Sequence, residues 1–238
     1  MAADLQSLLR DIRTGHRLTE SEALGLMTAN GRDVFAITAT ADEVREEKIG
    51  NIVTYVRNQN LHVTNICKNL CGFCGFGRRV GDEGEYCNDK AAIQAKALLA
   101  AGRGVTEICL LSAVHPDFTL YSYLDLLQWV HEVAPHVHLH AFSPDEVSYA
   151  AGRSGVSTRE VLERLKGAGL GSLQRTAAEI LVDPVRAVIC PKKVGTAEWV
   201  RIIKEAHHLG IPTTATIMYG HCESARDQVE HLAILRSI

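Results

Sequence analysis

The chain has 238 residues, of which 46% are hydrophobic and 22% are charged, and these proportions are ordinary for a globular protein. A formal net charge of −3 argues against a broad nucleic-acid-binding surface, because such surfaces are basic. No run approaches the roughly 18 consecutive apolar residues of a membrane-spanning helix. The first 20 residues lack the apolar run of a signal peptide. We therefore expect a cytoplasmic protein that binds neither membrane nor nucleic acid.

The N-terminal part of the sequence predicts helices. Residues 4–28 are expected to form two short helices that separate near Gly15, and residues 40–50 a third helix that ends at Gly50. Frequent β-branched residues then predict extended structure. We therefore divide the chain into an N-terminal helical extension, residues 1–50, and a second part, residues 51–238.

Strands and helices alternate over the second part. Strands are predicted near residues 61–66, 105–112, 136–142, 171–175 and 212–218. Helices are predicted at residues 88–102, 121–135, 157–169, 196–210 and 224–238. Short connections between such segments indicate an α/β fold with a parallel sheet, either an open doubly wound sheet or part of a TIM-type (β/α) barrel. A complete barrel takes about 250 residues, so a barrel here is partial and lacks its last βα units.

Seven cysteines in a protein expected to be cytoplasmic point to metal binding or reactivity, because cytosolic thiols stay reduced. Cys67, Cys71 and Cys74 lie close together where the first predicted strand ends, and the carboxyl ends of parallel strands form the open crevice of such folds. A 4Fe–4S cluster bound by three cysteines leaves one iron open to a small chelating ligand. A zinc site completed by a distant residue such as His62 or Cys87 stays open as the alternative.

The cysteine spacing resembles the signature of radical S-adenosylmethionine (radical SAM) enzymes. The pattern is C-x-x-x-C-x-Φ-C, in which Phe73 is the aromatic residue before the last cysteine. The resemblance implies a partial (β/α) barrel of that class and a 4Fe–4S cluster with Cys67, Cys71 and Cys74 as its ligands. It also implies S-adenosylmethionine at the open iron, whose cleavage gives a radical that abstracts hydrogen from the substrate.

Several further stretches are similar to the tyrosine-using FO synthase component family of coenzyme F420 biosynthesis. They are "VTYVRNQNLHVTNICKNLCGFCGF", "HLHAFSPDEV", "TAAEIL", "VRAVICPKK" and "HHLGIPTTATIMYGH". This resemblance implies a transferase that moves the 4-hydroxybenzyl group of L-tyrosine to 5-amino-6-(D-ribitylamino)uracil. The implied partners are the second radical SAM component of FO synthase and an electron donor such as flavodoxin or ferredoxin. The alternatives are an aminofutalosine synthase-like enzyme of the menaquinone pathway and a catalytically impaired remnant that still binds a cluster.

The resemblance also indicates cofactor-binding residues. Phe73 belongs to the signature, and Ser112 and Ala113 stand where the family has a Gly-Gly pair whose backbone binds the amino end of S-adenosylmethionine. Ser143 and Glu179 follow the third and fourth predicted strands and are assigned to the same cofactor. Ser143 has helix capping as its alternative role, and Glu179 has a salt bridge at a helix start.

His115, Tyr219 and His221 are the candidate catalytic residues. His115 keeps the family's His-Pro after the second strand, with ordering of that loop as its alternative role. Tyr219 and His221 follow the fifth predicted strand, where barrel active sites are built. Gln174 and Arg175 replace a Pro-Gly of the family, so we expect an altered turn before "TAAEIL".

Overall fold

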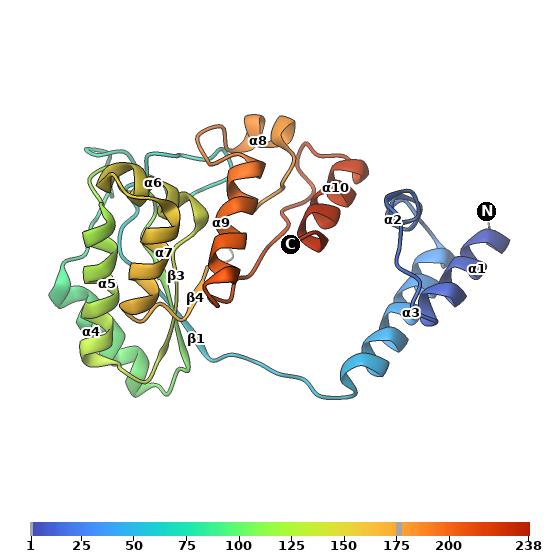
Figure 1. Ribbon diagram of the computed structural model, residues 1–238, viewed down its shortest axis with the longest axis horizontal. Helices are drawn as coiled ribbons and strands as arrows, with labels where there is room; N and C mark the ends of the chain where they lie inside the picture. The colour runs from blue at the N-terminus through green and yellow to red at the C-terminus, as the bar shows by residue number, and fades with distance from the viewer. Residues whose placement is uncertain (1, 175–177) are drawn as a thin grey trace. The chain divides into compact units, whose positions relative to one another are not determined.

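The computed structural model describes residues 2–174 and 178–238 (Figure 1). These residues form two compact units, one comprising Val56–His221 with Ile238 and the other the residues up to Tyr55 with Cys222–Ser237. The predicted division between residues 1–50 and 51–238 stays a prediction. No helix among the described residues is long and apolar enough to cross a membrane.

The smaller unit is helical. Its helices are α1 (Ala2–Arg13), α2 (Glu20–Met27), α3 (Arg32–Ile49) and α10 (Ala225–Arg236). The predicted break near Gly15 is confirmed, since Gly15 has a φ of 94° between α1 and α2. Helix α3 begins well before the predicted residue 40. The Thr38 hydroxyl donates to the Val34 carbonyl at 2.8 Å, which shows how a β-branched residue is accommodated inside this helix.

A parallel sheet in the order β1-β2-β3-β4 forms the centre of the larger unit. The strands are β1 (Asn58–His62), β2 (Glu107–Leu111), β3 (His138–Ala141) and β4 (Ser172–Leu173). The helices are α4 (Lys90–Gly102), α5 (Leu120–Val133), α6 (Pro144–Ser154), α7 (Thr158–Gly167), α8 (Asp183–Ile189) and α9 (Thr196–His208). His62 pairs with Leu111, and Leu110 with Ala141, so the carboxyl ends of the first three strands lie at one edge.

The helices α4, α5, α7 and α9 pack in succession beside the sheet (Figure 1). The buried core that includes these helices takes up alternate strand residues, among them Leu61, Ile108 and Leu110. The residues between them, such as Asn60 and Cys109, face away from that core. Helices of a doubly wound sheet would cover both faces, so this arrangement confirms the predicted α/β class and corresponds to part of a (β/α) barrel.

The predicted fifth strand at residues 212–218 is wrong. Among the described residues, this segment makes one isolated bridge, between Thr213 and Leu173, and no ladder. Strand β4 has only two residues and therefore gives the segment little edge to pair with. The short helix α8 was not predicted from the sequence, although Asp183 and Pro184 occupy its first turn, where acidic residues and proline are favoured.

We predict that Leu127→Ala lowers the free energy of unfolding by about 2–5 kcal/mol, because it leaves a cavity in a close-packed core. Leu127 lies on α5 and is fully buried. Urea denaturation followed by circular dichroism measures the change. Leu98→Ala on α4 is the matched control, because Leu98 is 59% exposed and its truncation should cost less than about 0.5 kcal/mol. Equal losses in the two variants would contradict the assignment of the core.

Candidate functional site

A cavity of about 530 Å³ lies at the carboxyl ends of the strands. Residues of β1, the loop after it, the end of β2, the start of α6 and the segment after β4 line it. The three signature cysteines line this cavity together with every predicted cofactor-binding residue, which are Phe73, Ser112, Ala113, Ser143 and Glu179. The structure therefore gathers eight of the predicted site residues around one space.

The loop that carries the cysteines is folded back on itself by backbone hydrogen bonds. The amide of Cys67 donates to the Arg78 carbonyl at 3.0 Å, and the amide of Cys74 donates to the Cys71 carbonyl at 3.0 Å. A Cβ at Gly77 would lie 3.9 Å from the Cβ of Cys67 and 4.0 Å from the Sγ of Cys74. The first and third cysteines therefore both lie close to Gly77.

The donor set of this loop fits an iron–sulfur cluster. Three thiols line one cavity. Of the two residues named as a fourth zinc ligand, Cys87 is exposed and does not line this cavity, whereas His62 does. Burial raises the pKa of the Cys71 thiol to about 12 in the metal-free chain, so metal binding has to displace its proton. No three donors among the described residues are already arranged around a common metal position.

A buried carboxylate connects the end of β2 to the start of α6. Glu146 accepts hydrogen bonds from the Ser112 hydroxyl and from the Ser143 hydroxyl, the latter at 2.8 Å. The Ser143 hydroxyl also accepts from the Glu146 amide at 3.4 Å, so Ser143 caps α6 while it lines the cavity. Burial raises the pKa of Glu146 to about 7, although these hydrogen bonds favour its charged form.

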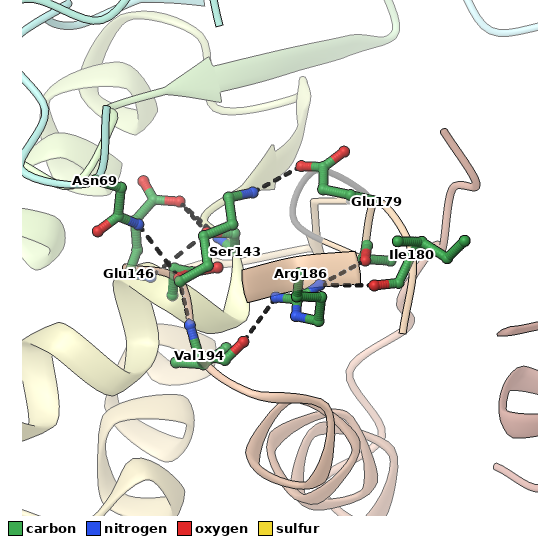
Figure 2. A network of polar contacts seen from close by, with 10 residues as sticks. Asn69, Ser143, Glu146, Glu179, Ile180, Arg186 and Val194 are labelled. Atoms are coloured by element: carbon green, nitrogen blue, oxygen red, sulfur yellow. Dashed lines mark hydrogen bonds and ion pairs between the residues drawn. The ribbon is translucent and has the colours of Figure 1, made fainter. Parts of the chain in front are cut away.

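An ion pair and a buried aspartate also line the cavity, and Figure 2 shows the network around them. Lys193 Nζ lies 2.7 Å from Glu179 Oε1 and 5.9 Å from the centre of the Phe73 ring. Burial alone would lower the pKa of Lys193, but the carboxylates of Glu179 and Asp145 outweigh it and raise that pKa. Asp145 Oδ1 accepts from Asn69 Nδ2 at 3.3 Å and from the Val194 amide at 3.0 Å.

The other oxygen of Asp145, Oδ2, is buried and has no hydrogen-bond partner within the described residues. Burial also raises the pKa of this carboxyl group. Since Asp145 lines the cavity, a bound ligand with a donor group can reach the side chain that holds this oxygen. Arg186 fixes the surrounding backbone by donating to the carbonyls of Ala178, at 2.7 Å, and Val194, at 2.6 Å (Figure 2).

The three predicted catalytic residues do not line the cavity. His115 is buried, stacks on Phe118 with ring centres 4.5 Å apart and accepts from the Asp117 amide at 3.2 Å, so it orders its loop. Burial lowers the pKa of His115. Tyr219 is 73% exposed, and His221 is exposed with its Nε2 3.0 Å from the Met218 carbonyl.

The altered turn predicted at Gln174 and Arg175 is described only in part. Gln174 is buried, lines the cavity and donates to the Leu110 carbonyl at 3.3 Å. Arg175 lies outside the described residues.

Sequence reasoning found Glu179 but missed the other charged residues of the cavity, which are Asp145, Glu146 and Lys193. Asp145 and Glu146 directly follow the third strand within "FSPDEV", and polar residues at such a position are a usual signal of a site in a parallel α/β fold. Lys193 carried no comparable signal, because the loop after α8 brings it to the cavity and α8 itself was not predicted.

Comparisons with known proteins agree with the cysteine pattern. The sequence profile of the Radical SAM superfamily matches residues 61–235. A protein of Methanosphaerula palustris named 5-amino-6-(D-ribitylamino)uracil–L-tyrosine 4-hydroxyphenyl transferase is 60% identical over 238 residues, which are 100% of this chain and 65% of that relative. A relative of the same name from Methanothermobacter thermautotrophicus is 47% identical over 93% of this chain and 60% of its own length. The chain thus spans less than two thirds of the length of these relatives.

Solved structures share the fold at low identity. Methylornithine synthase (PylB) superposes with a TM-score of 0.75 at 17% identity, covering 97% of this chain and 64% of that one. The FeFe-hydrogenase maturase HydG from Carboxydothermus hydrogenoformans superposes with a TM-score of 0.78 at 20% identity, covering 99% of this chain and 53% of that one.

We predict that Cys71→Ser abolishes cluster binding, because a hydroxyl cannot replace a thiolate ligand to iron. Iron and sulfide content and the visible absorption of anaerobically reconstituted protein measure the loss. Cys222→Ser is the matched control, since Cys222 is exposed and lies outside the cavity lining. A Cys71→Ser protein with a full complement of iron would contradict the assigned ligand set.

We predict that burial of Glu146 makes the free energy of unfolding depend on pH. Between its usual pKa of 4.5 and its folded pKa of about 7, the folded chain keeps a proton that the unfolded chain releases. The contribution of Glu146 to the free energy of unfolding is therefore fully present below pH 4.5 and is lost as the pH rises to about 7. This loss lowers the free energy of unfolding by up to about 3 kcal/mol. Urea denaturation across this window should give a flatter profile for Glu146→Gln than for the native chain. Identical profiles would exclude this cause.

Proposed function

Since this chain belongs to the radical SAM superfamily, we propose that it transfers the 4-hydroxybenzyl group of L-tyrosine to 5-amino-6-(D-ribitylamino)uracil. The observation that carries this proposal is the 60% identity over the whole chain to a relative of that name. Because that match spans residues 1–238, it includes the entire cavity lining. The relatives that carry this name are longer than this chain, so we propose, rather than observe, its substrates and partners.

The chain's own residues divide into a cluster-binding set and a cofactor-binding set. Cys67, Cys71 and Cys74 would hold the 4Fe–4S cluster, and S-adenosylmethionine would take the iron position that they leave open. When bound, these cofactors supply the electron and the radical chemistry of the superfamily. We assign the remaining cavity residues that the sequence predicts, Phe73, Ser112, Ala113, Ser143 and Glu179, to contacts with S-adenosylmethionine.

Lys193 extends the cofactor-binding set. Its ammonium group lies between the Glu179 carboxylate and the Phe73 ring, and Asp145 contributes a second carboxylate nearby. The cavity therefore offers both signs of charge on one wall, which suits a ligand with an amino group and a carboxylate. S-adenosylmethionine and L-tyrosine both carry this pair of groups.

Tyr219 and His221 are assigned to the substrate side of the reaction. The amide of Met218 donates to the carbonyl of Glu179 at 2.7 Å, which ties the segment that carries both residues to a residue of the cavity. Both side chains are exposed. His115 acts as a positioning residue, because its contacts are with its own loop.

The cellular setting follows from the chemistry. The cluster requires an electron donor, such as a flavodoxin or a ferredoxin. The product requires a second radical SAM component that closes the deazaflavin ring. We therefore propose both of these proteins as partners and the cytoplasm as the location.

The test is anaerobic turnover. We predict that reconstituted protein with a reductant, S-adenosylmethionine, L-tyrosine and the ribitylaminouracil forms 5′-deoxyadenosine and a product heavier than the uracil by the 4-hydroxybenzyl unit, detected by mass spectrometry. Omission of L-tyrosine and the Cys71→Ser variant are the controls. Product formed only from the menaquinone-pathway substrate would assign the chain to that pathway instead. A bound cluster without 5′-deoxyadenosine would contradict the enzyme assignment.

A further inference from the structure

An exposed aromatic ring stands at the β1 side of the cavity. Phe76 is 69% exposed, and its ring is stacked on His62, with centres 5.6 Å apart and planes 23° apart. Both residues line the cavity. A large apolar side chain left in solvent beside a ligand cavity gains free energy when a flat ligand covers it.

The same strand supplies a hydrogen-bonding group. Asn60 and His62 are two residues apart on β1, so they share the face that lines the cavity, opposite Cys109 and Leu111 of β2. Asn60 is exposed, and its side-chain amide carries both a hydrogen-bond donor and an acceptor.

The charges of the cavity are distributed unevenly. The lining residues of β1 and the cysteine loop, residues 60–77, include no carboxylate and no ammonium group. The charged lining residues Asp145, Glu146, Glu179 and Lys193 come from α6 and from the segments after β4 and α8. An uncharged planar ligand therefore fits the part of the cavity beside β1, and a zwitterionic amino acid fits the part lined by these charged residues.

We propose that Phe76, His62 and Asn60 form the subsite for the pyrimidinedione ring of the acceptor substrate. The ring stacks on Phe76, and the Asn60 amide pairs with one of the ring's adjacent carbonyl and N–H groups, as amide side chains pair with base edges. This subsite rests on the proposed function for the identity of its ligand. A phenol ring of tyrosine lacks the paired donor and acceptor and would leave the Asn60 amide unused.

The test measures equilibrium binding separately from turnover. The cluster-bearing protein, with S-adenosylmethionine present and no reductant, is dialysed anaerobically against 5-amino-6-(D-ribitylamino)uracil. We predict that Phe76→Ala weakens its binding by about ten-fold or more, because base–aromatic stacking is lost. Phe76→Trp restores binding, and Asn60→Ala weakens it several-fold. Phe35→Ala is the matched control, because Phe35 is a 76% exposed phenylalanine on α3, outside the cavity lining.

Each outcome decides one point. Unchanged binding in both Phe76→Ala and Asn60→Ala overturns the subsite, as does an uracil affinity too weak to measure in the native chain. The affinity for S-adenosylmethionine is measured in parallel. If the variants weaken only that affinity, the subsite is overturned as well, and the rings of Phe76 and His62 are assigned to the adenine of S-adenosylmethionine. If the native chain binds the uracil through Phe76 but forms no product from L-tyrosine, the proposed function fails while the subsite stands.

Discussion

The parallel register of β1, β2 and β3 determines where every part of the candidate site lies. His62 pairs with Leu111, and beyond the strand the amides of Val63 and Lys68 donate to the carbonyls of Leu111 and Val114, each at 2.9 Å. The loop that carries the cysteines is therefore tied to the end of β2 and its loop on both sides of residue 66. A shift of one residue in this pairing would turn the cavity-facing side chains of β1 into the core.

Buried polar groups hold the remaining walls in place. Glu146 joins the ends of β2 and β3, and Asp145 joins the cysteine loop, through Asn69, to the backbone of Val194. A buried carboxylate is stable only where donors surround it, so these contacts specify the arrangement more strictly than apolar packing does. The same contacts explain why α6 begins at the cavity rather than away from it.

The sequence predicted what depends on local spacing. The spacing of the cysteines, with three and then two residues between them, the alternation of β-branched and helical segments, and the cap at Ser143 all depend on residues a few positions apart. The structure agrees with these predictions in the type of most elements and in placing the cysteines on the cavity. The failures depend on contacts between distant segments. Residues 212–218 have a strand-like composition but find only a two-residue edge at β4, and Lys193 reaches the cavity because Arg186 bonds to the carbonyls of Ala178 and Val194.

Backbone strain gathers at the same edge of the sheet. The non-glycine residues with positive φ among those described are Leu70, Ala113, Phe142 and Glu179, at 45°, 50°, 59° and 46°, and one follows each of the four strands. Each such conformation costs about 1 kcal/mol or more for a residue with a Cβ, and strain of this kind concentrates at functional sites. At Ala113 the chain keeps the left-handed backbone that glycine favours, although the family's glycine is replaced. The residues on both sides of Ala113 are held by hydrogen bonds, from the Ser112 hydroxyl to Glu146 and from the Lys68 amide to the Val114 carbonyl. The backbone at Ala113 therefore keeps a glycine-like conformation, and alanine adds only a methyl group to it.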